Sequence, residues 1–418
     1  MADVKPGVAA PPAPDHVGEL ITELEREVLH DYAPPHVKRD AHPKMHGCVQ
    51  ATLKVDKGLP PELRVGVFDV AGNASSYLAW VRFSNAFQIQ HDLEYEARGM
   101  AVKLLGFQHH ASLLRDDVCD GTQDFIFATH DAFFLRDADI PLYREFAKAA
   151  AEGGRQVFTF FRKNGLFSGF VAMLRGAGAF GPAIHNPLAL TYYSQTPYKF
   201  GREKVVKLRA RPITPDMKPP LVDRLWWLVK AWLANGRLAI PPKAKAESWC
   251  DKYLAPRNYL RHALSRFLAT RAATFRIEVQ FQDDGMPIDD PTEPWSQLKS
   301  RFEPVATLTI PRQVFWPAPG MPETIREATA EMMELGENMS FNPWHSLAEH
   351  EPLGGINLAR KRIYSKLSQF RHDQNRVTAT RPGTQDNSHL LDPTREQYER
   401  LRERVQFGLI EPPPRRPQ

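Results

Sequence analysis

The sequence predicts an α+β fold in which an antiparallel β-barrel is surrounded by helices. Stretches rich in β-branched and aromatic residues, with partial period-2 alternation, recur along the chain at residues 38–55, 77–85, 96–107, 124–137, 190–211, 274–283 and 304–313. Turn-length connections separate several of them, and helical patterns gather in the middle and at the end, which favours an antiparallel barrel with outer helices. No P-loop sequence is present, so a P-loop nucleotide-binding fold has no support.

Composition and charge exclude several classes of protein. The 418 residues are 42% hydrophobic and 25% charged, as in ordinary globular proteins. The formal net charge of +5 is spread along the chain without a basic block, so we expect no nucleic-acid partner. The three cysteines are isolated and no secretory signal is evident, which together predict a cytoplasmic location.

We divide the chain into three parts. Residues 1–35 form an N-terminal arm, Pro- and Ala-rich at first and then amphipathic and helical from about residue 17 to 29. Residues 36–375 form the main domain, with a Trp-rich helical insertion at about 214–270, and residues 376–418 form a tail. The oligomeric state is open, and a homo-oligomer is compatible with the sequence.

Two histidines precede and enter the first predicted strand. Pro43 precludes a helix there, and Val49, Ala51 and Leu53 alternate as in a strand with one buried face. In an extended backbone His42 and His46 would point to the same side. We therefore expect a histidine to enter a buried pocket at the start of this strand.

One segment of the insertion is unusually hydrophobic. It begins with Leu221, ends with Ile240 and contains three tryptophans, but interspersed charges make a membrane-spanning helix unfavourable. The segment predicts either a helix packed on the core or one that makes peripheral contact with lipid.

A helix near the C-terminal end carries a distinctive pair of side chains. Pro352 and two glycines interrupt the backbone before a helical pattern that opens near Asn357. Arg360 and Tyr364 lie four residues apart and share one helical face. A guanidinium one turn away favours a phenolate, and tyrosinate is one of the proximal ligands of haem iron. Alone, the pair favours an amphipathic helix on which the tyrosine packs and the arginine reaches solvent.

Several short motifs, in matching order, resemble the haem-binding core of the catalase family. They are residues 39–44 (RDAHPK), 82–84 (RFS), 97–103 (ARGMAVK), 133–137 (FFLRD), 290–312, and Arg360-x-x-x-Tyr364 with Arg371 seven positions later. The resemblance spans roughly residues 35–375 and implies a catalase-like barrel that binds haem b.

The resemblance implies a role for each matched residue. His42 would be the distal acid–base group, with His46 as the alternative, and Tyr364 would be the ligand of the haem iron. The implied cofactor-binding residues are Arg39, Arg98, Phe134, Arg360, Tyr364 and Arg371.

Two departures from the family pattern bear on function. Thr129 stands where we align the distal asparagine of catalases, and one extra residue separates His42 from the end of the first strand. With the Trp-rich insertion, this pattern is similar to the divergent branch that includes organic-peroxide peroxidases and allene oxide synthases. We therefore expect a haem oxidoreductase that acts on an organic or fatty-acid hydroperoxide, with His42, Thr129 and Tyr364 as catalytic residues. The alternatives are a true catalase and a non-catalytic haem- or lipid-binding protein.

Overall fold

The computed structural model describes residues 15–377 and Leu401. Within this range it leaves gaps at 71–74, 87–88, 108–112, 115–120, 144, 147–148, 150–153, 168, 172–183, 216–220, 239–242 and 318–319. Apart from Arg376, Val377 and Leu401, the predicted C-terminal tail lies outside the described residues.

The centre of the molecule is a closed antiparallel barrel. Eight strands follow one another in the order β5-β4-β3-β2-β1-β9-β8-β7, pairing of β5 with β7 closes the ring, and β6 pairs with β7. The strands are β1 Met45–Val55, β2 Ser76–Asn85, β3 Arg98–Leu105, β4 Thr122–Ala128, β5 Tyr192–Tyr193, β6 Tyr198–Phe200, β7 Lys204–Pro212, β8 Ala273–Phe281 and β9 Phe302–Ile310. The predicted α+β barrel is confirmed.

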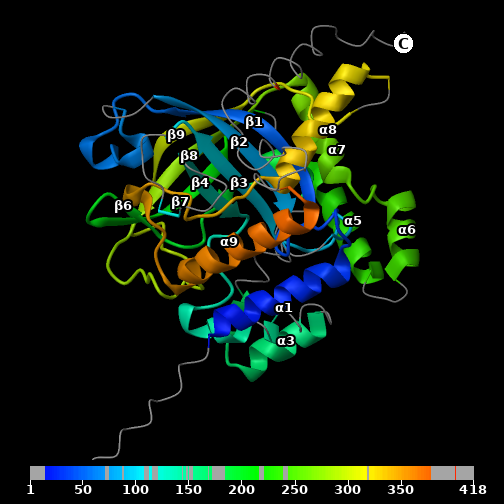
Figure 1. The fold of residues 1–418 in the computed structure, drawn as a ribbon, viewed down its shortest axis with the longest axis horizontal. Coiled ribbons are helices and arrows are strands. Elements are labelled where there is room, and N and C mark those ends of the chain that lie inside the picture. Colours follow the sequence, from blue (N-terminus) through cyan, green and yellow to red (C-terminus); the bar gives the residue numbers. More distant parts are fainter. Residues whose placement is uncertain are drawn as a thin grey trace, which may run out of the picture.

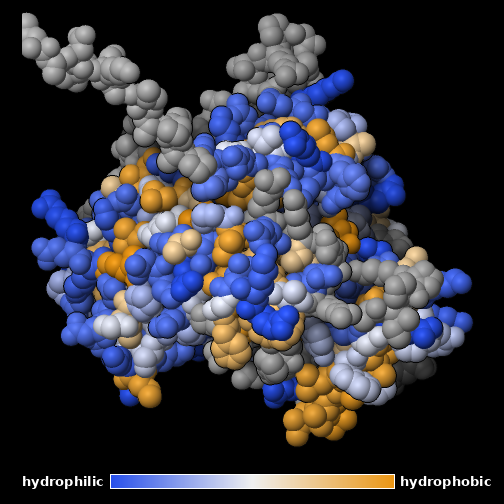
Figure 2. All heavy atoms as spheres, turned by 90° about the horizontal axis from the view of Figure 1, so that it is seen from below, coloured by the Kyte–Doolittle hydropathy of each residue, from blue (hydrophilic) through white to orange (hydrophobic). Residues whose placement is uncertain are grey.

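Helices cover the outside of the barrel (Figure 1). They are α1 His16–Asp31, α3 Gly154–Lys163, α5 Leu221–Leu238, α6 Lys243–Tyr253, α7 Tyr259–Thr270, α8 Glu323–Asn338 and α9 Gly355–Asn375. Helix α9 crosses one side of the barrel, α1 lies along α9, and α5 and α6 form a separate group at one side. Within the described part of the chain, no helix has both the length and the hydrophobicity needed to cross a bilayer. The face seen in Figure 2 mixes polar and hydrophobic side chains, with a compact hydrophobic protrusion at one edge.

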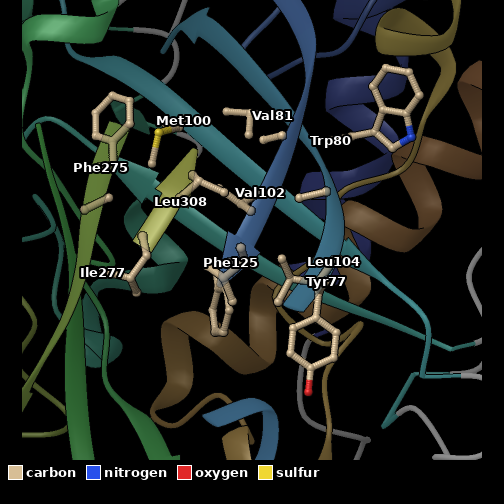
Figure 3. Close-up of a cluster of buried hydrophobic side chains, with 14 of the residues drawn as sticks. Tyr77, Trp80, Val81, Met100, Val102, Leu104, Phe125, Phe275, Ile277 and Leu308 are labelled. Atoms are coloured by element: carbon tan, nitrogen blue, oxygen red, sulfur yellow. The ribbon is translucent and has the colours of Figure 1, made fainter. Parts of the chain in front are cut away.

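The barrel interior is a hydrophobic core made by alternate residues of the strands. Val102 lies opposite Val81 on β2 and opposite Phe125 on β4, and all three are buried. Figure 3 shows these side chains gathered with Leu308 and Ile277, whereas Trp80, the neighbour of Val81, points away from them. Because successive side chains of a strand point to opposite faces, the neighbours of these core residues lie on the outer wall of the barrel.

Element boundaries differ from the predicted ones in several places, among them the end of β4 and the start of α9. Strand β4 ends at Ala128, and from Asp137 the chain forms a 3₁₀ helix, Asp137–Leu142. Helix α9 begins at Gly355 because the Asp137 carboxylate accepts hydrogen bonds from the backbone N–H groups of Gly355 and Ile356. This capping contact joins segments far apart in sequence, and it satisfies donors that every helix N-terminus leaves open.

Candidate active site

A cavity lies between the outer wall of the barrel and helix α9, and the space within it open to the centres of water molecules is about 90 Å³. Ser84, Gly99, Ala101 and Ile126 contribute to the barrel wall. The α9 wall consists of Ile363, Tyr364, Leu367, Ser368 and Arg371. The small side chains of β2 and β3 leave a slot between strand and helix.

His42 lies on the barrel side of the slot. It has a left-handed backbone conformation with φ of 61°, and its N–H donates to the Ala86 carbonyl at 2.9 Å. Its Nδ1 lies 3.0 Å from Ser84 Oγ and 2.7 Å from the Asn85 carbonyl oxygen. Since a carbonyl only accepts, Nδ1 carries the proton and the Nε2 lone pair is left to accept one.

The surroundings keep the His42 imidazole neutral. Burial, reinforced by the nearby Arg82 guanidinium, lowers the pKa of His42 to about 4. The ring fits against β3 because residue 99 is glycine, where a Cβ would lie 2.5 Å from His42 Cε1 and Nδ1. His42 is therefore a positioned, neutral base at ordinary pH.

Tyr364 lines the opposite wall, and Arg360 lies behind it. The Arg360 Cζ is 5.1 Å from the centre of the Tyr364 ring, and its Nη1 donates to Asn357 Oδ1 at 3.1 Å. Although burial disfavours the charged guanidinium, the phenol groups of Tyr364 and Tyr198 raise the pKa of Arg360. Arg360 is thus a buried cation held beside the Tyr364 ring.

Three arginines converge at one end of the cavity. Arg39, Arg82 and Arg371 all line it. Each donates hydrogen bonds to backbone carbonyls at the C-terminal end of α8 or just beyond it. Arg39 donates to the carbonyls of residues 336, 337 and 339, Arg82 to that of 336, and Arg371 to that of 338. A helix C-terminus carries partial negative charge, so it is a favourable anchor for cations.

The charge of this arginine cluster is only partly balanced. Glu337 Oε2 is 3.7 Å from Arg82 Nη2, and its Oε1 lies 3.3 Å from Lys38 Nζ. The Nε atoms of Arg39 and Arg371 are buried without a hydrogen-bond partner. Burial and repulsion from Arg82 lower the pKa of Arg371 to about 10. Such a cluster fits a ligand that presents more than one carboxylate.

His46 lies away from the cavity, contrary to the expectation that it shares a side with His42. Strand β1 starts at Met45, so His42 precedes it, and the β1–β2 register shifts between Met45 and Gly47. His46 is the extra residue of this β-bulge, and it accounts for the one-residue excess in the sequence. It is buried with Nδ1 3.9 Å from Asp92 Oδ1.

Three other predicted residues are also placed outside the cavity lining. The Thr129 hydroxyl accepts a hydrogen bond from the Arg98 backbone N–H at 3.0 Å. The Arg98 guanidinium bonds Glu96 and the carbonyls of residues 92 and 94, because strand alternation turns it away from the face of Gly99. Phe134 packs in an aromatic cluster, with its ring centre 4.5 Å from that of Phe146.

The structure adds cavity residues that the sequence reasoning did not assign. Arg82 and Ser84 reach the cavity from one face of β2, two residues apart, and Asp40 and Phe341 also line it. The signal for the first two was present in the RFS motif, since an arginine and a serine at spacing two on a strand share a face. Burial and repulsion from Glu27 and Asp31 raise the pKa of Asp40 to about 7.

Comparison with solved structures shows that the fold is similar to that of catalases. A fungal catalase superposes with a TM-score of 0.55 at 14% identity over 90% of this chain and 67% of the other. Catalase A from Saccharomyces cerevisiae superposes with a TM-score of 0.56 at 14% identity over 90% of this chain and 69% of the other. A bacterial catalase superposes with a TM-score of 0.54 at 15% identity over 92% of this chain and 66% of the other. The chain has the catalase fold. No protein-family model matches the sequence, and no curated protein matches it significantly.

Proposed function

We propose that this catalase-fold protein binds haem b in the slot between the barrel and α9 and processes organic hydroperoxides. The observation that carries the proposal is the placement of His42 on one wall and Tyr364 on the other, with the arginine cluster at one end. The cluster and Glu337 together carry a net charge of +2, from three guanidinium groups and one carboxylate, which suits the two propionates of haem b.

The cavity residues divide the work of such an enzyme. When bound, haem would supply the ferric iron and the redox chemistry of O–O cleavage, with Tyr364 as its phenolate ligand. Arg360 would stabilise the negative charge on that phenolate, while Arg39, Arg82 and Arg371 would hold the propionate edge. These roles rest on the contacts of each side chain described above.

His42 would move the proton. Its neutral Nε2 accepts the hydroperoxide proton and returns it to the oxygen that leaves, as general base and then general acid. Ser84 Oγ and the Asn85 carbonyl hold the tautomer and the ring orientation needed for both steps. Thr129 has no direct part, because its hydroxyl is bonded at the Arg98 backbone outside the cavity lining.

The cavity lining favours an organic substrate over hydrogen peroxide. Its apolar lining residues are Met100, Ile126, Phe127, Phe341, Ile363 and Leu367, and with haem in the slot they would pack against the porphyrin. The substrate preference rests instead on the polar groups. The described residues of the lining include no asparagine or glutamine, and a carboxamide donor would help to hold a small polar peroxide. The second candidate is a true catalase, which the fold supports as directly.

Steady-state assays of the purified haem-loaded protein test the proposal. We expect a ferric tyrosinate spectrum and a higher kcat/KM for a fatty-acid hydroperoxide than for hydrogen peroxide. Vigorous oxygen evolution from hydrogen peroxide without turnover of lipid hydroperoxides would establish the catalase alternative instead. A haem spectrum without turnover of either peroxide would indicate a binding protein.

A matched pair of histidine variants tests the assignment of the base. We expect His42→Ala to slow the peroxide step by roughly 10²–10⁴-fold, the usual span for general acid–base catalysis. His46→Ala changes a histidine of the same strand region that lies outside the cavity lining, so it should have a smaller effect. The reverse order of effects would assign the role to His46.

A further inference from the structure

Helix α5 carries a hydrophobic face that the described part of the molecule leaves uncovered. Side chains on its outer face are exposed to an unusual degree for their type, among them Val222 at 75%, Trp226 at 55% and Trp232 at 69%. Leu225, Val229 and Leu233 extend the same face and are also exposed. Figure 2 shows a compact hydrophobic protrusion at the lower edge of the view, to the right of its centre.

The opposite face of α5 is firmly attached to the body. Ala231, Ala234 and Leu238 are buried, and the last two belong to a cluster with Leu93, Cys250 and Leu260. Asn235 donates to the Leu93 carbonyl at 2.8 Å and accepts from the Tyr95 N–H at 3.0 Å. Helix α5 thus has an inner hydrophobic stripe that packs on the body of the protein and an outer hydrophobic stripe that is exposed. Packing of the core does not explain why the outer stripe is hydrophobic.

Cations and aromatic rings border the outer stripe. Lys230 and Arg237 lie seven residues apart and so leave α5 on the same flank. The Lys230 ammonium is 4.8 Å from the Trp227 ring centre, and Arg237 Cζ is 5.8 Å from that of Trp249 on α6. On α6, the Lys252 ammonium lies 4.9 Å from the ring centre of exposed Tyr253. Tryptophan, tyrosine and basic residues around an apolar stripe are the composition of helices that lie in the headgroup region of a bilayer.

We propose that the outer face of α5 docks the protein onto an anionic lipid surface, with Val222, Leu225, Trp226, Val229, Trp232 and Leu233 entering the acyl boundary. The bordering cations complement phosphate headgroups. A second copy of this chain fits less well, because a two-fold contact places each patch against itself and would bring its basic side chains together. The inference is independent of the haem chemistry, although it would bring the protein to a source of lipid hydroperoxides.

Vesicle sedimentation of the haem-loaded full chain tests the proposal. We expect binding to vesicles that contain phosphatidylglycerol, weaker binding to pure phosphatidylcholine, and weakening with added salt, because exposed charges are screened. The double substitution Trp226→Ser with Trp232→Ser should reduce the partition coefficient at least about tenfold. Both side chains are mostly exposed, so its melting temperature should stay near that of the parent protein.

Two matched variants separate lipid docking from general hydrophobicity. Leu298→Ser removes a side chain that is 98% exposed on a loop away from α5, so it should leave vesicle binding unchanged. Lys230→Glu with Arg237→Glu should abolish the preference for anionic vesicles. The proposal is overturned if the parent protein binds neither kind of vesicle, or if the tryptophan substitutions only convert a dimer into a monomer in light scattering. The haem spectrum and peroxide turnover, measured on the same samples, report on the proposed enzyme separately.

Discussion

The most direct test of the active-site geometry is the substitution of Gly99 by alanine. A Cβ at this position would lie 2.5 Å from His42 Cε1 and Nδ1 and 2.9 Å from Ser84 Oγ. Carbon atoms in normal contact are about 3.5–4.0 Å apart, so the imidazole must move by roughly 1 Å. This movement breaks or stretches the Nδ1 contacts of 3.0 and 2.7 Å that hold the tautomer.

We expect Gly99→Ala to lower kcat/KM for a hydroperoxide by about 10²-fold, the usual consequence of a 1 Å displacement of a reacting group. The three atoms nearest to the new methyl group belong to His42 and Ser84 rather than to the arginine cluster or Tyr364, so we expect haem content and the tyrosinate spectrum to be retained. Peroxide consumption in steady state, with the absorption spectrum of the same sample, measures both quantities.

Gly236→Ala is the matched control. A Cβ on Gly236 meets no atom within 4 Å, and the residue lies in helix α5, where alanine is favoured over glycine by up to about 1 kcal/mol. This variant should retain full activity. If Gly99→Ala were as active as Gly236→Ala with its haem spectrum intact, the assignment of His42 as the positioned base would be refuted.

Three further predictions follow from the cavity. Tyr364→Phe should abolish the tyrosinate signature and most activity in a folded protein, and an unchanged haem spectrum would disprove the ligand assignment. Arg82→Met removes one positive charge from the cluster. Losing a hydrogen bond to a charged group lowers the binding free energy by about 1.5–3 kcal/mol, so haem titration should show at least about tenfold weaker binding. Undiminished affinity for haem would argue against a propionate site. The folded state raises the pKa of Asp40 to about 7, so at intermediate pH the folded protein keeps a proton on Asp40 that the unfolded chain has already released. The parent protein therefore loses stability as the pH rises toward 7. Asp40→Asn should therefore have a free energy of unfolding about 1–3 kcal/mol larger than that of the parent at pH 8, and one close to that of the parent near pH 4. The range is kept small because Asp40 is only half-buried and solvent screens its charge. A difference in melting temperature that does not change with pH would contradict this.

Local patterns in the sequence were sufficient to predict the barrel and helix α9. Period-2 alternation located the strands because neighbouring side chains of a strand meet opposite environments, here the packed interior and the helix-covered wall. The spacing of four between Arg360 and Tyr364 places both on one face of α9 whatever the rest of the chain does. The exposed stripe of α5 was likewise visible as a hydrophobic segment with interspersed charges.

The choice among candidate residues depended on tertiary structure. Only the bulge at His46 and the left-handed backbone of His42 separate two histidines that an extended strand would place on one side. Arg39, Arg82 and Arg371 come from a loop, a strand and a helix, and they meet because all three bind the C-terminal end of α8 or the residues just after it. Arg98 carried an equally plausible motif, but it is one residue from Gly99 and therefore points to the other face of β3. Motifs report which side chains are present, whereas the register of strands and the docking of helices decide which of them share a cavity.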